Sequence, residues 1–217
     1  SQNILNLKVS EIIYVSNMLF MGNAQMIHVG TASDEMKSEF DINLLSVFKK
    51  VNKNVLFKLY PTTHINVGEH TNKYKPKRLV PNRYLDLNPI SKLVKTSQNV
   101  TLYEGNQDAL GMFKHHKIIV LAGCSTSLGN ALVSGIPLVY INSSQIRPMQ
   151  EETLNEFSKA VFCFNSEDGK FNNDLSDFLN LSVDQIQKLW NKKSVHRNQF
   201  IDKYIDSSKS NDSFENM

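Results

Sequence analysis

AGCSTSLGNALVSGIPLVYIN, residues 122–142, is the segment that decides the fold of this chain. It joins two apolar runs of strand length, 117–121 and 137–141, through a turn of small residues and a stretch of helical spacing. A strand, a turn, a helix and a returning strand make one βαβ unit, which implies a parallel sheet. The small-residue turn raises the question of which ligand it was built to hold.

Working outward from this segment, the same alternation of strand and helix patterns continues along the chain. Six apolar runs of strand length occur, and several are rich in Val and Ile without in/out alternation, as expected for strands covered by helices on both faces. They are 11–16, 55–60, 100–103, 117–121, 137–141 and 160–164. The sequence therefore predicts an α/β fold with a doubly wound, Rossmann-like parallel sheet of about six strands.

Stretches of helical spacing separate the predicted strands. Ser33 is the expected N-cap of a first helix, whose apolar positions are Met36, Phe40, Leu44, Leu45 and Phe48. Further helices are expected at about 86–95, with Pro89 in the first turn, and at 125–134, with Gly135 as a C-cap glycine. A C-terminal helical extension is expected near 173–179, 183–190 and 195–205. Residues 1–205 are thus predicted to form a single domain, followed by a polar tail, 206–217.

Composition excludes several classes of protein. The chain has 217 residues, of which 41% are hydrophobic and 21% charged, an ordinary globular composition. A net charge of +3 with scattered basic residues argues against nucleic acid as a partner. The two cysteines, Cys124 and Cys163, lie in apolar stretches, where they build neither a zinc spacing nor a disulfide framework, and this favours a reducing, cytoplasmic setting.

Neither a membrane-spanning segment nor a secretory signal is expected. No apolar run approaches the ~20 residues that cross a bilayer, and the N-terminus lacks a basic-then-apolar profile. The first residue is Ser1 rather than Met, which suggests an excised domain or a processed end.

The turn after 117–121 completes none of the familiar active-site loops. A Walker loop needs a lysine after its second glycine, whereas Asn130 follows Gly129. A nucleophile elbow needs a glycine where Ser127 stands. A cysteine phosphatase pattern needs an arginine six positions after Cys124, which is again Asn130. The dinucleotide fingerprint G-x-G-x-x-G is also missing.

A phosphate that is held rather than cleaved by the loop fits the turn better. A helix that starts at the carboxyl end of a strand directs free N–H groups and a positive dipole end at a ligand. Ser125, Thr126 and Ser127 would add hydroxyl donors to those N–H groups. The alternative is that Ser125 only caps the helix and that Gly123 only makes a tight turn. The segment alone leaves both interpretations open.

The segment resembles the second, nucleotide-sugar-binding domain of glycosyltransferases with the two-Rossmann-domain GT-B architecture. The similar features are the turn 123–127, a helix with Asn130 and Ala131 where many members have a Glu-Ala pair, and the returning run GIPLVYI, 135–141. The runs 11–23, 55–64 and 100–106 look like the first three strands of that domain in surface-polysaccharide and teichoic-acid-type transferases. The resemblance covers roughly residues 10–165.

The resemblance implies residues that bind the phosphates of the donor. They are Ser125, Thr126 and Ser127, together with His64, which follows the second strand, and Arg147, which Pro148 keeps extended. A solvated loop position is the alternative for both His64 and Arg147. Lys58, inside the second strand, is either directed at phosphate or extends to solvent from an exposed face. His115 and His116 precede the fourth strand, at the opposite end, and receive no role.

The resemblance also implies residues for the nucleoside. Glu104 and Gly105, at the end of the third strand, would lie beside the nucleobase. Asn130 stands where most retaining members carry an acidic residue, so a ribose-binding carboxylate would come from Glu151 or Glu152. The alternative is that these two glutamates only favour the start of a helix.

The implied function is that of a glycosyltransferase domain that binds a nucleotide sugar for transfer to a cell-surface polysaccharide or a related glycan or lipid-linked acceptor. The helix start and 125–127 would stabilise the charge on the leaving group, so neither a metal nor a cofactor is expected. Catalytic residues are not assigned, because the acceptor site and the base would come from an N-terminal Rossmann-like domain or a partner subunit. The location would be cytoplasmic or peripheral to the inner face of the membrane.

Two other functions fit the same pattern. Sugar-nucleotide 2-epimerases of the non-hydrolysing type have a similar turn, and IRPMQEE, 146–152, faintly resembles their Arg-Pro-Glu loop. A non-catalytic subunit that supplies a nucleotide-sugar site to another protein is the second alternative.

Overall fold

The computed structural model describes residues 10–16, 32–58, 89–103, 109–123, 126–146 and 148–205. Six strands form one parallel sheet in the order β3-β2-β1-β4-β5-β6. Their bounds are β1 Ile12–Val15, β2 Val55–Lys58, β3 Val100–Tyr103, β4 Ile118–Ala122, β5 Leu138–Asn142 and β6 Phe162–Asn165. The predicted six-stranded, doubly wound sheet is therefore confirmed, with small shifts of the strand ends.

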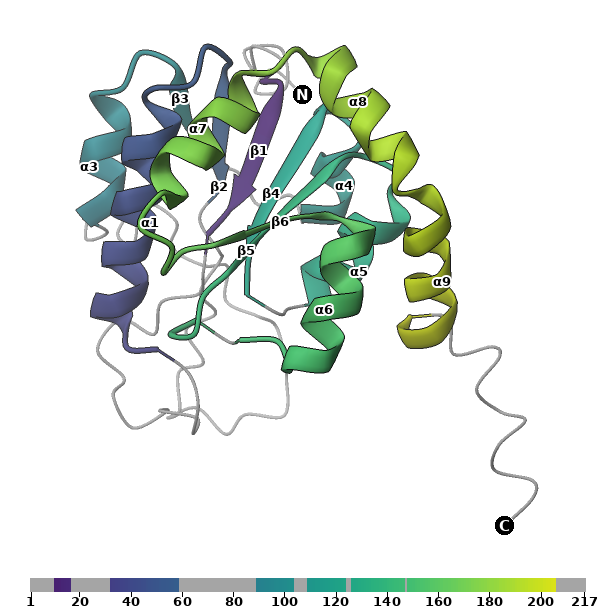
Figure 1. Cartoon of the computed structure of the whole chain (residues 1–217). Coiled ribbons are helices and arrows are strands. Elements are labelled where there is room, and N and C mark those ends of the chain that lie inside the picture. Colours follow the sequence, from purple (N-terminus) through teal and green to yellow (C-terminus); the bar gives the residue numbers. More distant parts are fainter. Residues whose placement is uncertain are drawn as a thin grey trace, which may run out of the picture.

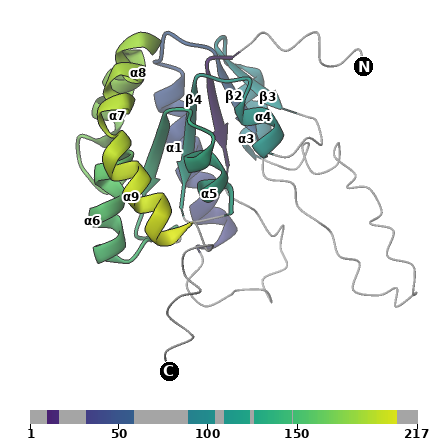
Figure 2. The ribbon, with the colours of Figure 1, turned by 90° about the vertical axis from the view of Figure 1, so that its right-hand side faces the viewer.

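Helices cover both faces of the sheet (Figure 1). The face that we call the α1 face carries α1 Asp34–Phe48, α3 Pro89–Lys95 and α7 Phe171–Asn180. The α5 face carries α4 Ala109–Phe113, α5 Thr126–Val133, α6 Glu151–Ala160 and α9 Ser194–Tyr204, while α8 Val183–Lys192 leads from α7 to α9. The view in Figure 2 is onto the α5 face, with α5 and α9 in front and α1 behind the strands.

The register of the strands determines which side chains share a face. Tyr14 is paired with Phe57 and packs on Phe48 of α1, with ring centroids 5.4 Å apart, so this row of residues lies on the α1 face. Tyr140 packs on Phe157 of α6 at 5.1 Å and belongs to the α5 face. Neighbours along each strand alternate between the two faces. Both rows are fully buried at these positions, which explains why the strands read as continuous apolar runs.

The first helix begins where the sequence predicted and buries Leu44, Leu45 and Phe48 as expected, but one predicted apolar position is exposed and two charged residues are buried. The hydroxyl oxygen of its N-cap, Ser33, accepts a hydrogen bond from the amide of Met36 at 3.2 Å. The side chain of Met36 is 37% exposed, so its prediction as a core position is wrong. Lys37 and Asp41 are buried instead, because the 3–4 spacing of Leu44 and Phe48 continues backwards through 41 and 37.

The predicted C-terminal extension is present as α7, α8 and α9. A capping box between Ser182 and Gln185 starts α8. The indole N–H of Trp190, on α8, donates to the carbonyl oxygen of Gly135 at 3.0 Å. Phe200 of α9 packs on Phe157 of α6 with centroids 5.0 Å apart. The Phe200 contact holds α9 against α6 on the α5 face, whereas α7 packs against α1 on the other face, and the predicted tail, 206–217, lies outside the described residues.

The short helix α4 was not predicted. With five residues it is shorter than two turns, so no apolar periodicity can build up along it. Gly135, after α5, has a φ of 75°, as expected for a residue that ends a helix in the left-handed conformation. No helix in the described part of the chain has the length and apolar character needed to cross a membrane.

Candidate functional site

The edge of the sheet at which all six strands end, here called the carboxyl edge, has its switch point between β1 and β4. The chain leaves β1 toward α1 on one face and leaves β4 toward α5 on the other. In doubly wound folds, ligands bind outside the strand ends at this point, because the two connections diverge there. The segment 122–142 therefore lies where this class of fold places its ligand.

Gly123 makes the turn between β4 and α5. It is buried and has a φ of 73°, a conformation that residues with a side chain rarely adopt. Its amide donates to the carbonyl oxygen of Ile141 on β5 at 3.4 Å, and α5 begins at Thr126. The glycine thus turns the chain from the end of β4 into the start of α5. This geometry is compatible with both predicted interpretations, a phosphate site and a helix cap.

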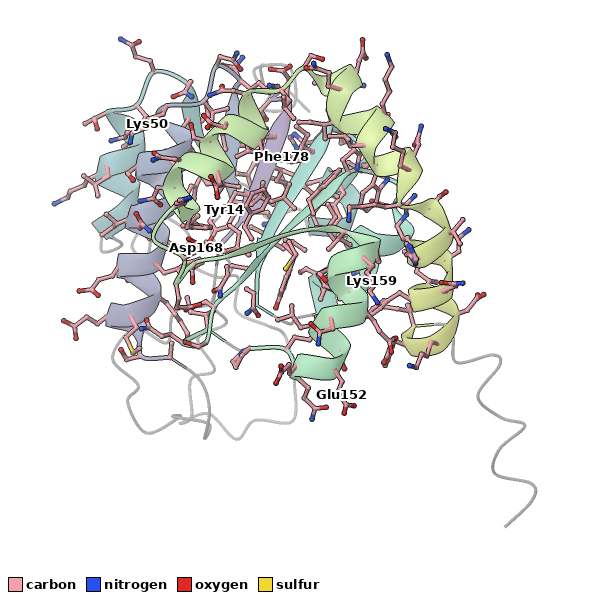
Figure 3. All side chains as sticks on the ribbon, in the orientation of Figure 1. Tyr14, Lys50, Glu152, Lys159, Asp168 and Phe178 are labelled. Carbon is pink, nitrogen blue, oxygen red and sulfur yellow. The ribbon has the colours of Figure 1, made fainter. Side chains whose placement is uncertain are left out.

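Four of the predicted site residues fall on described elements, and all four lie at the carboxyl edge. Thr126 and Ser127 are the first two residues of α5, and the side chain of Ser127 is half-buried. Glu151 and Glu152 form the first turn of α6 and are exposed, and Figure 3 shows Glu152 at that end of the helix. Because β4 and β5 are neighbours, the starts of α5 and α6 lie on the same face of adjacent strands.

The other predicted site residues lie outside the described part of the chain. They are Ser125, Arg147, His64, Glu104 and Gly105.

Lys58, the last residue of β2, lies at this edge, on the α5 face. Its side chain is only 3% exposed, and its ammonium nitrogen lies 5.1 Å from the centre of the Tyr103 ring on β3. The alternative that Lys58 extends to solvent from an exposed face is therefore wrong. A cation held over an aromatic ring next to the end of β1 adds positive charge to the carboxyl edge.

A second group of buried polar residues, which the sequence did not reveal, lies on the α1 face. Lys37 is 4% exposed and lies in the part of α1 that starts at the carboxyl edge. Ser16, directly after β1, is also buried, and its amide extends the ladder by donating to the carbonyl oxygen of Lys58 at 2.9 Å. One turn further along α1, Asp41 contacts Tyr14 of β1. The spacing 37, 41, 44, 48 was the available signal.

The loops after β5 and β6 are joined by Glu167. Its Oε1 atom accepts hydrogen bonds from the hydroxyl groups of Ser143 at 3.0 Å and Ser166 at 3.0 Å, and from the amide of Ser144 at 3.0 Å. Although burial alone would raise the pKa of Glu167, these hydrogen bonds lower it below its usual value. Glu167 therefore acts as an ionised anchor for this part of the carboxyl edge.

Asn142, the last residue of β5, carries an acceptor without a protein partner. Its Oδ1 atom is buried and makes no hydrogen bond. The alternation along β5 places Asn142 on the α5 face, like Tyr140, between the starts of α5 and α6. Buried carbonyl oxygens in proteins are nearly always hydrogen-bonded. An N–H or O–H group of a ligand would satisfy this atom.

Two other groups of chemical interest do not contribute to the carboxyl edge. Burial raises the pKa of the half-buried Cys163 thiol to about 11, so it is not a thiolate nucleophile near neutral pH. His116 lies before β4, at the opposite edge, where its Nδ1 atom is 2.8 Å from the carbonyl oxygen of Ser10. Burial lowers its pKa. Its position at the opposite edge is the one that the sequence predicted.

The hydrogen-bond donors and positive charges at the carboxyl edge suit the binding of an anion better than that of a cation. Ser127, at the start of α5, lies at the same edge as Lys58, the last residue of β2, and as the part of α1 that carries the buried Lys37. Within the described ranges, no group of three or more His, Cys, Asp or Glu side chains could hold a metal ion.

Comparison with known proteins gives a glycosyltransferase as a structural neighbour. No protein-family model and no curated protein matches the chain. One similar solved structure is described as "Crystal Structure Analysis of the Glycotransferase of kitacinnamycin". The match has a TM-score of 0.40 and 15% sequence identity, and it covers 86% of this chain and 40% of that one. This chain thus corresponds to less than half of the length of that enzyme.

Proposed function

We propose that this chain is the donor-binding domain of a glycosyltransferase with GT-B architecture and that it holds a nucleotide sugar at the carboxyl edge. One observation carries the proposal: the Gly123 turn and the start of α5 lie directly at the switch point between β1 and β4. A diphosphate is the group that fits a helix start bearing hydroxyl side chains, because N–H groups and the dipole both favour negative charge there.

In this proposal, the residues around α5 act on the leaving group. The N–H groups of the first turn, together with Ser125, Thr126 and Ser127, bind the phosphates and stabilise the negative charge that grows as the sugar is released. Lys58 and Lys37 add positive charge from β2 and α1. Because these groups supply the neutralising charge, the proposal includes neither a divalent metal nor a cofactor.

The nucleoside would extend from α5 toward α6. A carboxylate at the start of α6, Glu151 or Glu152, would accept hydrogen bonds from ribose hydroxyls, and the free Oδ1 atom of Asn142 would accept one more. Glu104 and Gly105 are proposed for the base, and His64 and Arg147 for the phosphates.

The acceptor site and the catalytic base are assigned to an N-terminal Rossmann-like domain or a partner subunit. The acceptor class that we propose is a cell-surface polysaccharide or a related lipid-linked glycan. Such an acceptor would place the protein in the cytoplasm, either free or at the inner face of the membrane.

A thermal-shift panel tests the donor site. The panel contains UDP, GDP, CDP, CMP, ADP, ATP, NAD and UDP-sugars at millimolar concentration, because a ligand that binds only the folded state raises the apparent stability. One nucleotide is expected to raise the melting temperature of the wild type and to lose that effect in the double variant Ser125→Ala/Thr126→Ala. Ser134→Ala is the matched control, since Ser134 follows the other end of the same helix and bonds the carbonyl oxygen of Ala131. A shift that survives in the double variant, or none at all, contradicts the proposal.

The same preparation distinguishes the alternatives. Incubation with the nucleotide sugar that binds, followed by NMR of the sugar, would reveal a C2 epimer if the chain is an epimerase-like domain. Binding without any turnover, even after addition of the upstream domain, would indicate a non-catalytic subunit.

A further inference from the structure

A tyrosine and a carboxyl group form a fully buried pair between β1 and α1. Tyr14 is 0% and Asp41 is 1% exposed, and the hydroxyl of Tyr14 donates a hydrogen bond to Oδ1 of Asp41. The second oxygen, Oδ2, is buried and has no hydrogen-bond partner. Figure 3 shows Tyr14 inside the molecule, between the helices of the α1 face and the sheet.

The geometry favours a proton on this carboxyl group. An ionised Asp41 would leave a buried charge with a single hydrogen bond, and burial strongly disfavours a charge that is so poorly compensated. A protonated Asp41 leaves one neutral hydroxyl unsatisfied, which costs less than a buried charge. In agreement with this, burial raises the pKa of Asp41 to about 8, while the hydrogen bond from Tyr14 acts in the opposite direction.

Other charged groups around the pair do not change this balance. Lys37 lies one turn before Asp41 on the same buried face of α1, but burial and the hydrogen bond from Tyr14 are the causes that set the pKa of Asp41. The charged residues of the two helices that pack on α1 are exposed and face solvent; they are Lys92 and Lys95 on α3 and Asp174 and Asp177 on α7. From the sheet side, Tyr14 is covered by Phe57, which is apolar.

We propose that the Tyr14–Asp41 pair is a proton-dependent switch that holds α1 against the sheet when Asp41 is protonated and releases it when the proton is lost. When α1 opens, Asp41 returns toward its ordinary pKa of 3.8, whereas in the closed state its pKa is about 8. Between these two values the open state binds fewer protons. The stabilisation of closed α1 is therefore fully present below about pH 4 and is lost as the pH rises to about 8.

The switch has a direct consequence for the carboxyl edge. The N-terminal part of α1 begins at this edge and carries Lys37. Opening of α1 would therefore move one wall of the switch point and one of its cations. This inference depends on the Tyr14–Asp41 contact and not on any ligand, so its tests are independent of those of the proposed donor site.

Carbon-13 NMR of the aspartate carboxyl groups tests the protonation state directly. The Asp41 signal is assigned as the one missing from Asp41→Asn. It is expected to titrate near pH 8 in the wild type. Titration near pH 4 would overturn the proposal, whether or not the variant folds as stably as the wild type.

Amide hydrogen exchange tests whether the proton controls α1. After correction for intrinsic exchange rates, the opening constant of α1 amides is expected to rise by up to about 10-fold per pH unit between pH 5 and 8. In Asp41→Asn, the opening constant of α1 should no longer depend on pH. In Tyr14→Phe, which lacks the hydrogen bond that lowers the pKa of Asp41, the rise of the opening constant should continue to higher pH. Amides of α6 and α9 serve as the internal control. A slope that persists in Asp41→Asn, or that is equal in α6 and α9, rules out the switch.

Discussion

Glu167 ties the ends of two strands together through one oxygen atom. Its hydrogen bonds reach Ser143 and Ser144 after β5 and Ser166 after β6. This contact could not be predicted from the sequence pattern, because Ser143 and Glu167 are 24 residues apart. Serines in loops are usually taken for solvated turn residues.

Glu167→Gln is expected to lower the free energy of unfolding at pH 7 by no more than about 1 kcal/mol, since the side chain is exposed and water competes for it. The folded state lowers the pKa of Glu167 below 4.5, so its contribution is present above pH 4.5 and is lost as the pH falls through the lower, folded value. Urea unfolding at pH 7 and pH 3 measures the difference, with the exposed Glu152→Gln as control. A difference that is as large at pH 3 as at pH 7 would contradict this account.

Four candidate site residues could be placed at the carboxyl edge from the sequence, because each follows a predictable strand in a βαβ unit. They are Thr126, Ser127, Glu151 and Glu152. It could not reveal Lys37 and Asp41. A pattern of apolar and polar residues assigns charged side chains to the outer face of a helix, whereas both of these are buried and Asp41 is bonded to Tyr14.

At the scale of elements, all six strands could be predicted because helices cover both faces of the sheet. Each strand then reads as an unbroken apolar run between turn residues. The start of α1 was predictable from its cap, since Ser33 followed by two acidic residues favours a helix start and the observed bond to Met36 follows from it. Helix α4 could not be predicted, because five residues are too few to show the apolar period of a helix.

The two glycines of the α5 region are expected to respond oppositely to alanine. Gly129 lies within α5, and an added Cβ would meet Cδ1 of Ile205 at 3.6 Å, an ordinary contact. Gly129→Ala should therefore stabilise the protein by about 0.5–1 kcal/mol. Gly135 has a φ of 75°, so Gly135→Ala should destabilise it by about 1 kcal/mol or more. Thermal unfolding of both variants checks the pair, and equal signs would refute the explanation.

Lys53 caps the end of α7 from a distant part of the chain. Its ammonium group donates to the carbonyl oxygens of Leu179 and Leu181, each at 2.6 Å. Lys53→Met keeps the apolar stem but removes both donors, so the free energy of unfolding should fall by about 1–3 kcal/mol. Lys50→Met, at an exposed position just before it, is the control. Equal stabilities of the two variants in urea would show that the cap contributes nothing.

At the scale of the whole molecule, the two edges of the sheet differ in how they are built. At the opposite edge, where the strands begin and which we call the amino edge, side chains bind backbone atoms. The side-chain amide of Asn99 donates to the carbonyl oxygens of Phe48 and Val51, and the indole of Trp190 donates to that of Gly135. The carboxyl edge gathers cations, hydroxyl groups and an unpaired acceptor. The sequence could not predict this site in full, because residues from separate connections assemble it and loops follow neither the helix nor the strand period.

This difference between the two edges predicts which NMR signals shift when the proposed donor nucleotide is added. In a titration with the nucleotide that raises the melting temperature, followed by amide NMR, the signals of Gly123 and Ser127 are expected to move, since Gly123 makes the turn before α5 and Ser127 lies in its first turn. The chain has a single tryptophan, Trp190, whose indole N–H is bonded to Gly135 beyond the opposite end of that helix. Its indole signal should stay in place, because the electrostatic effect of a bound diphosphate is largely screened beyond a Debye length of about 8 Å. Movement of the Trp190 signal without movement at Gly123 would place the ligand on the amino edge or the C-terminal helices and would remove the carboxyl edge as the binding site.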